Sequence, residues 1–108
     1  MGDWSEIFFN ECGIEISAEG FILGADTNAI EFHVVKEVDE SEWSVEGSEK
    51  FLETVQAIVG DYGHMENRSE EFYYHVATTG RVVPGGQEGA DAEVDFLRKL
   101  ADLVVQGM

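Results

Sequence analysis

Residues 29 to 38 have the pattern of a β-strand with one buried and one polar face. Ile30, Phe32 and Val34 are spaced two apart, which places all three on the same face of a strand. The opposite face receives Glu31, His33 and Val35. Such a strand predicts a sheet that packs one face on a hydrophobic core and presents the other to different surroundings.

A helix is predicted between residues 48 and 59, where the spacing of apolar residues changes from two to three and four. Ser48 is typical of a helix N-cap, and Gly60 is typical of the position where a helix ends. The apolar stripe of this helix consists of Phe51, Leu52, Val55, Ile58 and Val59.

The first twelve residues are also predicted to form a helix, which Gly13 would end. Asp3 with Glu6 three residues later is typical of a helix start. The apolar residues at helical spacing are Trp4, Ile7, Phe8 and Cys12. In this helix Cys12 would be a small buried residue, whereas a strand opening at residues 7–9 is the alternative.

The rest of the chain predicts further strands and a last helix. That helix begins with Asp91 as its cap and carries apolar residues on more than one side. The other predicted strands cover residues 14–17, 21–23, 72–77 and 81–83, and the predicted turns, loops and linker cover residues 18–20, 24–28, 61–69, 79–80 and 85–89.

These elements follow one another in the order α-β-β-β-α-β-β-α. The order predicts a fold of the α+β class, with an antiparallel sheet of about five strands and helices packed on one face. The 108 residues, 44% of them hydrophobic, are enough for one core, so residues 1–108 are expected to form a single domain.

Residues 37 to 49, which we call the acidic segment, contain six carboxylates and no base. Glu37 closes the preceding strand, and Glu49 lies at the predicted start of the following helix, where the helix dipole favours anions. The acidic residues without such a local role, together with the one aromatic residue among them, are the predicted partner-binding residues: Asp39, Glu40, Glu42, Trp43 and Glu46.

Trp43 in this segment has two possible interpretations. An aromatic side chain within a polar rim is typical of an interface hot spot. The alternative is that Trp43 folds back onto the core as a lid, and the acidic segment would then be a solvated loop that keeps the protein soluble. If the acids around the start of the last helix share a face with the segment, the two form one negative patch.

The net charge of −17 limits the partners that the chain can have. A surface this acidic repels nucleic acids and anionic membranes, so direct binding to either is not expected. The six basic residues are scattered and form no stripe that could follow a phosphate backbone. Basic proteins and cations remain as the expected partners.

The single cysteine, Cys12, excludes a disulfide within the chain and is typical of a reducing compartment. The N-terminal residues lack the basic and apolar regions of a signal peptide, and no run of 18 apolar residues occurs. We therefore expect a soluble cytoplasmic protein.

No motif in the sequence names a reaction, so no catalytic residues and no cofactor are predicted. His33, His64 and His75 are the candidate metal ligands, but no His-x-x-x-His or Cys-x-x-Cys spacing supports them. His33 and His75 would approach each other only if their strands were neighbours. Ordinary surface histidines are the favoured interpretation, and no metal site is predicted.

The sequence favours a non-enzymatic protein that binds and blocks a basic surface on a partner protein. In size, charge and mixed composition the chain is similar to phage-encoded inhibitors of bacterial defence, including anti-CRISPR and anti-restriction DNA mimics, and to acidic immunity proteins that neutralise nuclease toxins. This resemblance of composition implies a nucleic-acid-binding partner and transfers no residue. The alternatives are an acidity adapted to a high-salt cytosol, and a small metal-binding or enzymatic domain.

The last helix adds one more expectation. Its apolar residues occupy more of its circumference than a helix packed on one side needs, which favours a homodimer formed through this helix.

Overall fold

The computed structural model describes residues 2–22, 28–60, 62–83 and 86–108, which form one α+β arrangement. The predicted fold class is therefore confirmed, with six strands in the sheet. In chain order the elements are β1 (Gly2–Glu11), β2 (Ile14–Ile22), β3 (Asn28–Glu37), α1 (Val45–Val59), β4 (Met65–Asn67), β5 (Tyr73–Thr78), β6 (Arg81–Val83) and α2 (Gly86–Gly107).

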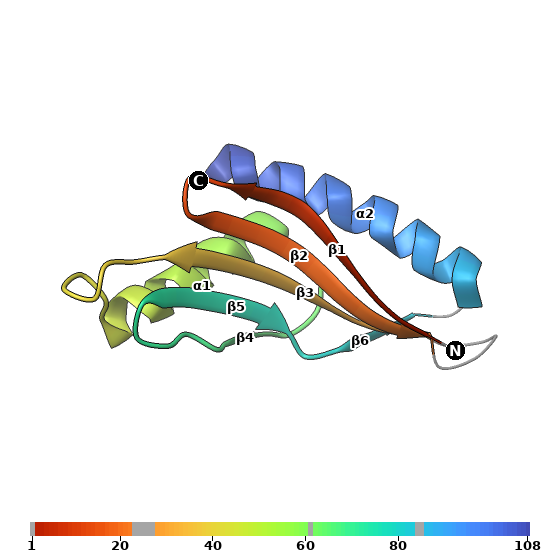
Figure 1. The fold of residues 1–108 in the computed structure, drawn as a ribbon, viewed down its shortest axis with the longest axis horizontal. Coiled ribbons are helices and arrows are strands. Elements are labelled where there is room, and N and C mark those ends of the chain that lie inside the picture. The colour runs from red at the N-terminus through yellow and green to blue at the C-terminus, as the bar shows by residue number, and fades with distance from the viewer. Residues whose placement is uncertain (1, 23–27, 61, 84–85) are drawn as a thin grey trace.

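Strand β3 is the centre of the sheet. One of its edges pairs with β2, and its other edge pairs with β6 near its start and with β5 near its end, all antiparallel. The sheet order is β1-β2-β3-β5-β4, with β6 beside β3. Figure 1 shows both helices on the same side of this sheet.

The helices cover the face that the alternation in β3 makes apolar. Ile30, Phe32 and Val34 are at most 1% exposed, as their spacing predicts. They belong to one cluster with Val55 of α1 and Leu97 of α2. Because both helices lie on this side, the opposite face of β2, β3 and β5 has no helix over it in the described part of the chain (Figure 1).

The N-terminal helix is the largest error of the sequence-based prediction, because residues 2–11 form β1 instead. Cys12 and Gly13 have φ angles of 57° and 77°, so they form a tight turn that returns the chain antiparallel as β2. An irregularity in pairing at Phe8, between Ile7 and Phe9, interrupts the alternation of this strand. That interruption imitates helical spacing. Cys12 lies in the turn after β1 and is exposed, not buried as predicted.

The turn predicted at residues 18–20 is also wrong, because β2 continues through it to Ile22. Glycine is required at position 20 because a Cβ there would overlap the ring of Trp4, which lies opposite on β1. Its role is close packing between two strands. The predicted loop at residues 24–28 lies mostly outside the described residues.

Both helices begin earlier than predicted. Helix α1 starts at Val45 with Ser44 as its N-cap, whose Oγ accepts a hydrogen bond from the Gly47 amide at 2.9 Å. Ser48 is buried within the first turns, whereas Gly60 ends the helix as predicted. Gly86 begins α2, so the described part of the predicted linker is helical.

The predicted loop at 61–69 contains the short strand β4.

None of the helices in the described ranges is long and apolar enough to cross a membrane.

The packing of Trp4 on Gly20 gives a direct test of the β1–β2 pairing. We expect Gly20→Ala to lower the free energy of unfolding by about 1–3 kcal/mol, because the added methyl group overpacks the contact. In a Trp4→Leu background the same substitution should cost much less, since the obstructing ring is gone. Urea unfolding of the four proteins in this cycle measures the difference, and equal costs in both backgrounds would contradict the pairing.

Candidate functional site

The acidic segment forms a turn closed on one backbone carbonyl. The amides of Glu42 and Trp43 both donate to the carbonyl oxygen of Asp39, at 2.8 and 3.0 Å. The side chains of Asp39, Glu40 and Glu42 are exposed, as is that of Glu46 in the first turn of α1. None of these four carboxylates forms an ion pair with a residue that the structure describes, so their charges are not neutralised there.

Trp43 differs from the four acids because it is partly buried. Its indole Nε1 donates to the backbone carbonyl of Tyr73 at 3.2 Å. The ring therefore fastens the acidic segment to the start of β5. Trp43 is not among the described residues that pack against the hydrophobic core, so the ring is held on the backbone of β5 and not as a lid on the core.

Phe72 is an exposed aromatic residue beside the acidic segment. Its side chain is 56% exposed, and its carbonyl accepts a hydrogen bond from the Val38 amide at 2.8 Å. Its φ angle of 126° is strained for a residue with a side chain. The alternation of β5 would place Phe72 on the core face with Tyr74, but this backbone conformation turns it outward. Sequence periodicity carries no signal for such a reversal.

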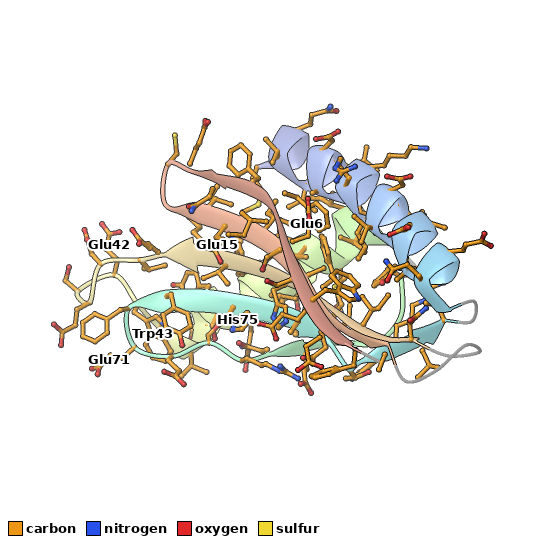
Figure 2. The ribbon with its side chains drawn as sticks, turned by 45° about the vertical axis from the view of Figure 1, so that its right-hand side comes forward. Glu6, Glu15, Glu42, Trp43, Glu71 and His75 are labelled. Atoms are coloured by element: carbon orange, nitrogen blue, oxygen red, sulfur yellow. The ribbon has the colours of Figure 1, made fainter. Side chains whose placement is uncertain are left out.

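The turn that contains Phe72 brings two more acids close to the acidic segment. The Tyr73 amide donates to the carbonyl of Glu70 at 3.1 Å, which folds residues 70–73 into a tight turn. Glu70 and Glu71 are exposed there. Figure 2 shows Glu71 at the same end of the molecule as Glu42. We call this group the acidic end, and its residues are Glu37, Asp39, Glu40, Glu42, Glu46, Glu70, Glu71 and Phe72.

The surface of the acidic end is hollowed where the turn that joins β1 to β2, the end of β3 and the start of β5 meet. The residues that line the hollow include Cys12, Gly13, Glu37, Asp39 and Phe72. An apolar ring therefore stands at the edge of a depression with carboxylates in its wall.

The acids around the start of α2 do not join this group. Helix α2 begins at the right of Figure 1, whereas the connection between β3 and α1 lies at the left. The negative patch that would have combined the two is therefore not formed.

The uncovered face of the sheet holds the two histidines that the sequence separates by 42 positions. Because β3 and β5 are neighbours, His33 and His75 meet, and the Nδ1 of His33 lies 2.8 Å from the Nε2 of His75. Burial lowers the pKa of His33, although the charges of Glu31 and Glu19 oppose this effect. Burial also lowers the pKa of His75, so both rings favour the neutral form near neutral pH.

Carboxylates surround this histidine pair. Arg68 Nη2 lies 2.7 Å from an oxygen of Glu31 and 2.7 Å from an oxygen of Glu66. One ligand atom from each of Glu19, Glu31 and His33 lies within 4.8 Å of the others. His33 is among the candidate ligands that the sequence indicates and Glu19 is not, although the alternation that begins at Glu15 predicts the face of Glu19 if it is continued past residue 17.

His64 lies apart from this cluster. It is exposed, and its carbonyl accepts from the amide of Thr79 at 3.1 Å. Of the three histidines considered as metal ligands, the fold thus pairs two.

Comparison of the chain with protein-family models, with curated proteins and with solved structures finds no match. The function is therefore inferred from the geometry of these two surfaces.

The strain at Phe72 predicts an unusual order of stabilities. Phe72→Gly and Phe72→Ala both remove the ring, but only alanine keeps the Cβ that conflicts with the positive φ angle. We expect the glycine variant to be more stable than the alanine variant by about 1 kcal/mol, the reverse of the order at an ordinary strand position. Urea unfolding of both variants measures this difference, and a more stable alanine variant would show that the backbone is not strained.

Proposed function

We propose that the protein is a non-enzymatic, acidic interaction protein that binds and blocks a basic, nucleic-acid-binding surface of a partner protein in the cytoplasm. The observation that carries the proposal is the acidic end, where exposed carboxylates from two separate chain segments, residues 37–46 and 70–71, gather without an ion-paired base in the described part of the chain. Acidic residues that served only to keep the protein soluble would not need to lie together at one end of the molecule.

The distribution of bases supports the proposal. Arg68 forms its ion pairs on the open sheet face, and Arg98 forms its pairs with Glu6 and Asp95. The guanidinium of Arg81 lies over the ring of Tyr62, 4.6 Å from its centroid. The arginines are thus engaged elsewhere. The two lysines next to the acidic segment, Lys36 and Lys50, are exposed and form no ion pair in the described part of the chain, so six acids against two lysines leave a negative field that attracts a basic surface.

Phe72 gives the acidic end the second element of a typical interface. Hot spots combine an aromatic anchor with a polar rim that excludes water. The strained backbone at Phe72 holds the ring outward, and strain of this kind gathers at functional positions. Phe72 therefore replaces Trp43 as the main aromatic contact that we propose, while Trp43 contributes its exposed part.

Affinity capture with two matched variants tests the proposal. The immobilised protein is incubated with a lysate at 0.1 M and at 1 M NaCl. The lysate comes from the organism that makes the protein or from the cell on which that organism acts. We expect a basic protein that is released at high salt, because the Debye length falls from about 10 Å to about 3 Å. Glu40→Gln/Glu42→Gln should lose most of this protein, whereas Glu88→Gln/Asp91→Asn, which removes the same charge near the start of α2, at the opposite end of the molecule (Figure 1), should retain it. Added duplex DNA should compete for the captured protein.

Three outcomes would contradict the proposal. Equal loss in both double variants would mean that only total charge matters. A captured protein that resists high salt and duplex DNA would exclude the phosphate-like role. Folding that requires molar salt would favour the high-salt adaptation in its place.

We also propose that the chain pairs with itself through α2. Phe96 and Leu103 lie seven residues apart on this helix and are 45% and 50% exposed. Light scattering at micromolar concentration should give the mass of a dimer, and Leu103→Glu should give that of a monomer because it places a charge in the apolar contact. A monomeric mass for the unmodified chain would exclude this pairing.

A further inference from the structure

Three side chains with metal-ligand atoms converge on the open face of the sheet. Glu19 of β2 is paired directly with Glu31 of β3, and His33 follows two residues later on the same face of β3. One nitrogen or oxygen from each of the three residues lies within 4.8 Å of the other two. The antiparallel register therefore brings together ligands from two strands.

The pairing of Glu19 with Glu31 is unfavourable as it stands. Like charges directly opposite each other on neighbouring strands destabilise a sheet. Arg68 compensates Glu31, but it shares its charge with Glu66. No described residue forms an ion pair with Glu19. A cation between the two carboxylates would remove the repulsion.

His33 provides an independent indication of such a cation. The residue is only 8% exposed, and its Nε2 is buried without a hydrogen-bond partner. This nitrogen faces an oxygen of Glu31 at 3.8 Å, which is too long for a hydrogen bond. A buried ring nitrogen left unpaired beside a carboxylate costs free energy unless a ligand occupies the space between them.

The other ring nitrogen of His33 forms a hydrogen bond of the kind that is typical of metal-binding histidines. In the tautomer that carries the proton on Nδ1, His33 donates to the Nε2 of His75 across 2.8 Å. The lone pair on the Nε2 of His33 then points at the carboxylates. Ligating histidines typically donate their second ring N–H to an acceptor, which fixes both the tautomer and the orientation of the ring.

From this geometry we propose that Glu19, Glu31 and His33 bind a divalent transition-metal ion of the zinc class. One imidazole and two carboxylates are a ligand set that zinc accepts, with a remaining position for water. Two ligands of a tetrahedral zinc ion lie about 3.3–3.6 Å apart, given metal–ligand distances of about 2.0–2.2 Å. The 3.8 Å between His33 and Glu31 is close to that separation. Glu19 is exposed and free to rotate toward them.

The ligand set also selects against the hard cations. Mg²⁺ and Ca²⁺ prefer shells made of oxygen alone, and the buried imidazole offers them nothing. Arg68 occupies one oxygen of Glu31 and leaves the other, Oε1, on the side of His33.

Calorimetric titration of the full chain with ZnCl₂, after removal of metals with a chelator, tests the proposal. We expect one tight site per chain and an affinity at least about tenfold lower in Glu19→Gln and in His33→Gln. The matched control is Glu53→Gln, which removes the same charge from an exposed position of α1 outside the cluster and should bind as the unmodified chain does. This control separates a built site from the general attraction of a cation to an acidic protein.

A second measurement covers the case in which His33→Gln fails to fold. In the unmodified chain, zinc should shift the Nε2 resonance of His33 in a long-range ¹H–¹⁵N spectrum and leave the ring of His64 unchanged. The proposal is overturned if His33 stays unshifted, if Glu53→Gln loses as much affinity as Glu19→Gln, or if Mg²⁺ binds as tightly as zinc.

Discussion

The alternation of side chains along β3 is the constraint on which the rest of the structure depends. It places Ile30, Phe32 and Val34 on one face, where they are almost fully buried under both helices. The hydrophobic effect thereby determines which side of the sheet the helices cover. The same alternation leaves His33 and Glu31 on the other side, and the strand ends where the chain turns into the acidic segment. Both candidate surfaces follow from one central strand.

The two surfaces differ in how water and salt act on them. The carboxylates of the acidic end are exposed, so each contributes little alone and their sum is weakened by salt. The cluster around His33 is partly buried, where charges are screened much less and an unpaired polar atom costs more. A partner at the acidic end would accordingly respond steeply to ionic strength, while the cluster depends on the geometry of a few ligand atoms.

The sequence alone predicts those parts of the fold that local patterns determine. The alternation in β3, the short strand at 81–83 and the end of α1 at Gly60 are confirmed. The first strand was missed because Gly13 with a positive φ suits a helix end and a hairpin turn equally, and the irregular pairing at Phe8 hides the alternation. The contact of His33 with His75 depends on which strands are neighbours, and the outward turn of Phe72 depends on one backbone angle. The spacing of apolar residues along the sequence carries no information about either feature.

We propose that the acidic end is the surface that meets a basic partner. Amide hydrogen exchange, measured on the chain alone and in complex with the captured partner, tests it most directly. The account predicts slower exchange in the complex at residues 38–46 and 70–73, with exchange along the outer face of α2 unchanged. Protection confined to α2, with residues 38–46 exchanging as in the free chain, would contradict it.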